Sequence, residues 1–326
     1  SPHSTPPAAA RASAATASST VPTEDPIAVE AAAKANAPLT EAEEGLHREL
    51  LLLCKLDAHS PAEARALLAA AAARAPLFCR LGADGMAPVH WLCLSREVNV
   101  RLLQALLGSS AHAAAVADVR GMLPLHHLCA NEGAAAEALL VLLEVYEVAA
   151  RRVAHFGQLP LHRLLGGPAA GDARPTTLLL SAFPQALQHT DASGMLPLHW
   201  ACRAPLAASR DALHELLLAA PRSAAKPDRR GRLPLHVLCS NPALGIESLE
   251  RVLAAQPTAS DAADADGQLP LHRLMKAHPE ASDMWQTLMR AGSRGAVASA
   301  AAGGAPAQKR ASKPAVVVQK GDVAGI

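Results

Sequence analysis

The chain has 326 residues, of which half are apolar and only 2% aromatic, and its formal net charge is +1. This nearly balanced charge excludes a general nucleic-acid-binding or acidic-membrane-binding surface, because both need a clear excess of Lys and Arg. No run of about 20 apolar residues free of charge and Pro occurs. We therefore expect no membrane-spanning helix and a soluble chain with a large core.

Residues 1–39 are rich in Ala, Ser, Thr and Pro, which is typical of a disordered linker. The remnant of a transit segment is the alternative, and the missing initiator Met leaves a fragment or a processed form open. Residues 40–81 contain two helical stretches, EEGLHRELLLLC and PAEARALLAAAAARA, without the turn that later segments carry. They predict a degenerate N-terminal capping unit, whose outer face meets water instead of a neighbour.

A motif of the form GMLPLHHLC then recurs with a fixed period. Its His falls at His90, His126, His162, His199, His236 and His272, at intervals of 36, 36, 37, 37 and 36 residues. Such a period predicts a solenoid, in which each repeat buries its apolar face against its neighbours. Repeats 1 to 6 are assigned to residues 82–117, 118–153, 154–190, 191–227, 228–263 and 264–296, and the aperiodic residues 297–326 to a disordered tail.

Each repeat predicts a turn, a short helix, a loop and a longer second helix. The sequences DVRG, DASG, DRRG and DADG suit tight turns, and Pro124 and its equivalents fit the first turn of a helix. Apolar residues about 13, 16 and 17 positions after the His form one helical stripe, as at Leu139, Leu142 and Leu143. The residues that mark the end of the second helix are Pro184, Pro221 and Pro257.

The turn, the PLH sequence at a helix start and the helix pair resemble the ankyrin repeat, which has a period of about 33 residues and the motif T-P-L-H-x-A. LPLH occurs in five of the six repeats, and repeat 1 has APVH. The resemblance implies an all-α, ankyrin-like solenoid of stacked helix-turn-helix units joined by β-turn or hairpin-like loops. Two departures are the additional residues, which we place between the second helix and the next turn, and the replacement of the family's Thr by Leu or Ala. The His must therefore find another partner, such as a backbone group.

The repeated His and Cys raise the question of a metal or redox site. Cys54, Cys93, Cys129, Cys202 and Cys239 occupy a helix position that holds Leu165 and Met275 elsewhere, which favours packing over ligation. Packed helices lie too far apart for equivalent cysteines to form disulfides, which suits a reducing, intracellular compartment. His126 with Cys129, or His236 with Cys239, lacks a second ligand pair within its repeat, so no metal or cofactor is expected.

Motifs of common catalytic sites are missing, and the recurring Asp residues are turn formers, so the chain is not expected to be an enzyme.

Positions that vary between regular neighbours predict a binding surface. One row follows the turn Gly: Met86, Met122, Gln158, Met195, Arg232 and Gln268. A second row follows the His: Trp91, His127, Arg163, Trp200, Val237 and Arg273. The resemblance implies that the first row lies on the turn tips and the second on the concave short-helix face, where ankyrin-like arrays hold protein partners. Met, Trp and Arg are types enriched in interfaces, although partial burial of the two Trp residues and ordinary exposed turns remain alternatives.

Arg229, Arg230 and Arg232 form one basic tip, which favours an acidic partner or a solvated turn.

The predicted function is a scaffold or adaptor for another protein. We expect no binding to nucleic acid, no membrane insertion and a monomeric chain. We expect a cytoplasmic protein, with the nucleus and an organelle left open. The alternatives are a metal- or redox-responsive sensor built on the His and Cys positions, and the targeting region of a larger enzyme. The segment QKRASKP favours a solubilising tail over nuclear targeting or phosphorylation.

Overall fold

The structure is a computed structural model that describes residues 25–55, 66, 69–70, 76–132, 136–168, 173–204 and 206–301, except for the side chains of residues 76, 206–209 and 293–301. The helix predicted over PAEARALLAAAAARA lies almost entirely outside these residues, as do residues 1–24 and 302–326. The chain forms two compact parts, which are residues 1–169 with 174–186, and residues 170–173 with 187–326.

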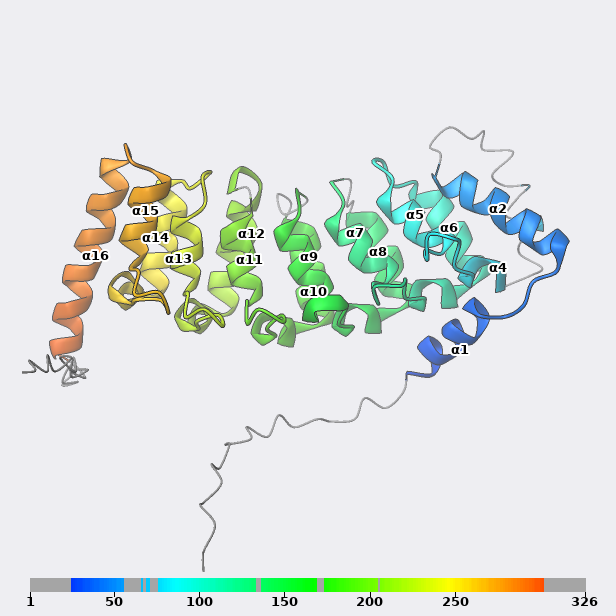
Figure 1. The fold of residues 1–326 in the computed structure, drawn as a ribbon, viewed down its shortest axis with the longest axis horizontal. Coiled ribbons are helices and arrows are strands. Elements are labelled where there is room, and N and C mark those ends of the chain that lie inside the picture. Colours follow the sequence, from blue (N-terminus) through cyan, green and yellow to red (C-terminus); the bar gives the residue numbers. More distant parts are fainter. Residues whose placement is uncertain are drawn as a thin grey trace, which may run out of the picture. The chain divides into compact units, whose positions relative to one another are not determined.

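The N-terminal part contains repeats 1 to 3 and the helices that precede them (Figure 1). Its α-helices are α1 (Pro26–Ala35), α2 (Glu41–Lys55), α4 (Pro76–Cys79), α5 (Pro88–Leu94), α6 (Val100–Ser109), α7 (Pro124–Ala130), α8 (Ala136–Val145), α9 (Pro160–Gly166) and α10 (Ala173–Ala182). Its 3-10 helices are η1 (Ala111–Ala115), η2 (Glu147–Arg151), η3 (His155–Gly157) and η5 (Pro184–Gln188), the last of which reaches the C-terminal part. The short helices pack in chain order, α2 on α5, α5 on α7 and α7 on α9, and the second helix α6 packs on α8.

The C-terminal part repeats this arrangement. Its helices are α11 (Pro197–Arg203), α12 (Leu206–Ala219), η6 (Pro221–Ala225), α13 (Pro234–Cys239), α14 (Ile246–Ala255), η7 (Pro257–Asp261), α15 (Pro270–Ala277) and α16 (Ser282–Ala301). The short helices α11, α13 and α15 pack in order, and so do α12, α14 and α16. Each short helix also packs on the second helix of its own repeat, as for α11 and α12. The part of the chain that the structure describes contains helices and turns but no strand, which confirms the predicted all-α, ankyrin-like fold.

The helix pairs form for the reasons that the sequence indicates. Every repeat's short helix has Pro at its first position, where the missing N–H leaves no bond unmade. In α8 the predicted stripe of Leu139, Leu142 and Leu143 is buried. Burial of one such side chain stabilises the fold by roughly 1.5–3 kcal/mol. The core of each part is therefore a row of Leu stripes between neighbouring repeats.

A short 3-10 helix lies between the second helix and the next turn in repeats 1 to 5. In repeats 3 to 5 this helix begins at Pro184, Pro221 and Pro257, directly after the second helix has ended. The three Pro residues follow the end of the second helix, as predicted, and the segment in which we place the additional residues is helical where a loop was expected.

Two predicted disordered segments contain helix. Residues 26–35 of the segment 1–39 form α1, and α16 continues to Ala301, beyond the boundary set at 296. Residues 26–35 were wrongly predicted to be disordered because their Ala-rich sequence has little helical patterning. They form a helix whose N-terminus is capped by Asp25, which accepts the N–H of Ile27. Among the described residues, none of the helices has both the length and the apolar character that crossing a membrane would require.

Candidate functional site

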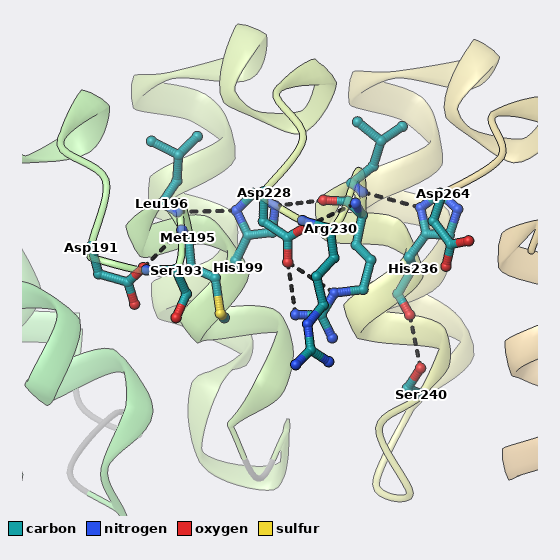
Figure 2. A network of polar contacts seen from close by, with 12 residues as sticks. Asp191, Ser193, Met195, Leu196, His199, Asp228, Arg230, His236, Ser240 and Asp264 are labelled. Carbon is teal, nitrogen blue, oxygen red and sulfur yellow. Dashed lines mark hydrogen bonds and ion pairs between the residues drawn. The ribbon is translucent and has the colours of Figure 1, made fainter. Parts of the chain in front are cut away.

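The His of repeats 1, 2, 4 and 5 bridges two segments of backbone. Its Nδ1 accepts a hydrogen bond from the N–H three residues earlier, as in Leu123 to His126 at 3.1 Å. Its Nε2 faces a carbonyl near the next turn, such as that of Arg152, also at 3.1 Å. His199 likewise joins the N–H of Leu196 to the carbonyl of Arg232, and Figure 2 shows its bond with Leu196. The prediction that the His finds a backbone partner and ties neighbouring repeats together is confirmed in these four repeats.

These contacts fix the protonation state of the ring. Because Nδ1 accepts from an N–H, the proton of the neutral ring is on Nε2, which donates to the carbonyl. Burial is the main cause that lowers the pKa of His90 and of His126 to about 4, and it also lowers the pKa of His199 and of His236. Both nitrogens are therefore occupied within the fold, and neither is free to bind a metal ion.

The cysteines that accompany these histidines are packing residues. All six are unpaired thiols and buried. Burial raises the pKa of Cys54 and of Cys239 to about 12, and it raises the pKa of Cys93, Cys129 and Cys202 as well. A reactive or metal-binding Cys must be a thiolate, which this environment disfavours. In the residues that the structure covers, no three His, Cys, Asp or Glu side chains gather in a way that could hold a metal ion.

The Asp at the start of a repeat's turn holds that turn with one carboxylate oxygen. In repeat 2 the Oδ1 of Asp118 accepts the N–H groups of Arg120 and Met122, each at 2.8 Å. The same pair of bonds forms at Asp191, Asp228 and Asp264. Burial by itself raises the pKa of Asp118 and of Asp228, but their hydrogen bonds outweigh it and hold each pKa below its usual range. These carboxylates are structural, as predicted.

The second oxygen of the same Asp accepts a side chain, usually the residue that follows the His. The donors to Oδ2 are His127 at 2.9 Å, Trp200 at 3.0 Å, and Arg273, whose Nε is at 3.1 Å. In repeat 5, where Val237 cannot donate, Arg232 takes this place (2.8 Å; Figure 2 shows Asp228 within this network). The row predicted to face a partner is therefore partly occupied by bonds within the protein, and His127 and Val237 are buried.

Repeats 1 and 3 lack this Asp. Gly82 and Ala154 stand at its position, and the two residues that should bond to it, Trp91 and Arg163, each have a buried side-chain N–H without an acceptor among the described residues. Trp91 is covered by the Lys55 ammonium, 4.2 Å from the ring centre. In repeat 3 the turn also differs in its backbone, because Phe156 has a φ of 63°, in the left-handed region that only Gly adopts readily.

The row that follows the turn Gly is less exposed than predicted. Met122 and Met195 are only 8% and 5% exposed, so the expectation of exposed Met side chains was wrong at these two positions. Met86, Gln158 and Arg232 are half-buried and Gln268 is exposed. The position directly after the Gly turns back toward the short helix, which explains its burial.

The turn tips consist instead of the two residues before each Gly. These are exposed in every repeat and differ in chemistry: Ala83 and Asp84, Val119 and Arg120, His155 and Phe156, Ala192 and Ser193, Arg229 and Arg230, Ala265 and Asp266. Only Arg229 and Arg230 among them were predicted. The signal for the others was present, because they lie directly before the recurring Gly and differ between most repeats. Neighbouring tips are joined by backbone bonds, such as Val119 N–H to the Gly85 carbonyl and Ala265 N–H to that of Arg230.

Comparison with solved structures agrees with this geometry. The crystal structure of the human ASB11 ankyrin repeat domain is similar, with a TM-score of 0.53 and 19% sequence identity over 78% of this chain and 98% of that domain. No protein-family model matches the chain, and neither does any curated protein. The likeness shows that the protein has the fold of an ankyrin repeat domain, as the sequence resemblance implied.

Proposed function

We propose that this protein is a scaffold or adaptor that binds another protein through its turn tips and the adjoining short-helix face, without chemistry of its own. The observation that carries the proposal is the contrast within a repeat between recurring residues that maintain the fold and variable residues that face solvent. The recurring Asp and Cys are buried, and so is the recurring His except for His272. The His and Asp are bonded within the protein, whereas the paired tip residues are exposed and vary from repeat to repeat. Met86, Gln158 and Gln268 flank the tips and extend the same surface.

A rigid array suits this function because its binding residues are ordered before the partner arrives. The Asp carboxylates fix the turns, and bonds between neighbouring turns fix the spacing of the tips within each part of the chain. Binding then costs little conformational entropy. The buried, unpaired thiols suit a reducing compartment, so we place the protein in the cytoplasm, as a monomer.

Affinity capture from the native cell tests the proposal. One variant replaces the exposed tip residues Val119, Phe156, Arg229 and Arg230 by Ser. Its matched control replaces two Leu and two Arg that are exposed on second helices, namely Leu140, Leu218, Arg101 and Arg251, by Ser. At equal thermal stability, the tip variant should lose a defined protein that the wild type and the control retain. Loss by both variants, or retention by both, would contradict a partner site at the tips.

A further inference from the structure

We propose that Arg163 anchors a carboxylate of the partner protein at repeat 3, where Ala154 replaces the chain's own carboxylate. This inference rests on the proposed function and gives the partner a chemistry. Its basis is the comparison of two repeats that carry the same Arg. In repeat 6 both Nε and Nη2 of Arg273 donate to Oδ2 of Asp264. In repeat 3 the equivalent Arg163 has a methyl group at that place, and its buried Nε has no acceptor among the described residues.

The positive charge of Arg163 acts on two histidines of repeat 2. The pKa values of His126 and His127 are lowered mainly by the burial of these two rings, and the charge of Arg163 lowers them further. The structural carboxylate of repeat 2, Asp118, is already engaged by His127 and two backbone N–H groups. Arg163 is half-buried and has no counter-ion among the described residues. Such a guanidinium is unfavourable, and it gains most from a carboxylate, which matches its fork of donors.

The surroundings of Arg163 indicate what accompanies that carboxylate. Val119, Val153 and Phe156 are 75%, 49% and 66% exposed, and they belong to the turns of repeats 2 and 3, which the bond from the His155 N–H to the Arg120 carbonyl joins. Arg120 and Arg151 are exposed beside them. An apolar, basic surface of this kind is complementary to a peptide segment that carries Asp or Glu next to an apolar side chain.

The backbone of Phe156 supports the same location. A left-handed conformation is unfavourable for a residue with a bulky side chain, and such residues cluster at functional sites. Ala154 offers no carboxylate to hold the N–H groups of Phe156 and Gln158 in the manner of the Asp turns. Phe156 thus projects into solvent, with its ring against that of His155 (4.0 Å between centres). Asp84, the acidic tip residue of repeat 1, is bonded to Lys55 at 2.6 Å.

A random dodecapeptide library displayed on phage tests the inference against the full chain. The enriched peptides should contain Asp or Glu beside an apolar residue. Synthetic copies should bind Arg163→Gln and Ala154→Asp at least about tenfold more weakly than wild type. The Ala154→Asp variant keeps the Arg but gives it an internal carboxylate, so its loss of binding cannot come from unfolding if its thermal midpoint is unchanged or higher. Arg210→Gln, at an exposed Arg paired with Glu247, is the control and should bind as wild type.

Two outcomes would overturn the inference. One is enrichment of peptides without acidic residues or of none at all. The other is equal binding to wild type and to Ala154→Asp. Peptides that bind elsewhere on the tips would leave the proposed function standing, which the capture experiment with the tip variant decides independently.

Discussion

The His of repeats 1, 2, 4 and 5 is held in its neutral form because its two ring nitrogens face opposite kinds of backbone group. At His126 a backbone N–H points at Nδ1 and a carbonyl at Nε2. A hydroxyl at the helix start could satisfy only the first helical turn, whereas an imidazole spans the gap to the next turn. The replacement of Thr by Leu before this His is therefore compatible with the fold, since the N–H that Thr would engage is not the one that His126 binds.

His126→Leu should lower the free energy of unfolding by about 2–4 kcal/mol, because it leaves a buried N–H and a buried carbonyl without partners. The matched change His272→Leu should cost only about 0.5–1 kcal/mol, since His272 is exposed and among the described residues bonds only to the Leu269 N–H. Urea denaturation of the two variants measures the difference. Equal losses would show that the bridging bond adds nothing to helix capping.

The turn Asp gives a reciprocal pair of variants. Asp191→Ala removes the acceptor of two backbone N–H groups and of the Trp200 indole, and it should destabilise the protein by about 2–4 kcal/mol. Ala154→Asp supplies the missing acceptor in repeat 3 and should stabilise it by about 1–2 kcal/mol. Thermal denaturation checks both signs, with Ala192→Asp at an exposed tip as the control. Destabilisation by Ala154→Asp would mean that repeat 3 cannot adopt the Asp turn.

Residue identity predicted the backbone partner of the His and the burial of the Cys. It did not predict that the residues directly after the His donate to the turn Asp. The link between Trp200 and Asp191 spans nine residues and depends on how the short helix leans over its own turn. The periodicity of the sequence does not predict this orientation of the short helix. The sequence does show, however, that the turn Asp and the residue that donates to it vary together among the repeats. Where Val237 cannot donate, Arg232 does so, and where the Asp is lost, the donor at Trp91 or Arg163 is left without an acceptor.

At the scale of elements, α1 shows what pattern analysis misses. The helix buries only Ala31 and Ala35, so it has no apolar stripe by which to recognise it. Tertiary contacts hold it instead. The Tyr146 hydroxyl donates to Asp25, His112 lies 2.9 Å from Glu30, and Arg80 donates to the carbonyl of Ala37 at 2.6 Å. The repeats were predictable because each carries its own signature, and α1 was not because its stability comes from residues far along the chain.

Tyr146→Phe should therefore loosen α1 without disturbing the repeats. The variant keeps the ring but removes the hydroxyl that bonds to the N-terminal cap of the helix. Amide hydrogen exchange over residues 26–36 should accelerate about tenfold, which corresponds to the loss of one charge-assisted bond. Exchange in α8, at whose end Tyr146 lies, should stay unchanged. Equal acceleration in both helices would indicate general destabilisation, and no acceleration would show that α1 is held by other contacts.

At the scale of the whole molecule, stability is distributed over the contacts between neighbouring repeats. The same buried His stands at these contacts in repeats 1, 2, 4 and 5, in each case facing a carbonyl near the following turn. A solenoid that repeats one titratable group also repeats its response to pH. The molecule as a whole should therefore be more sensitive to mild acid than a single buried His would make it.

The sign of this response follows from linkage. His90 and His126 have a pKa of about 4 in the folded chain and of about 6.5 when unfolded, so between these values the unfolded chain binds more protons. Stability is thus complete above about pH 6.5 and is lost as the pH falls toward 4. At pH 5 each of these two residues should cost about 2 kcal/mol. The lowered pKa of His199 and of His236 acts in the same direction, whereas Asp118 and Asp228 contribute only below about pH 4.

Urea midpoints at pH 7.5 and 5.0 measure this loss of stability. His126→Gln, whose amide can both accept and donate but does not titrate, should show a smaller drop than wild type, and an equal drop would place the acid sensitivity elsewhere.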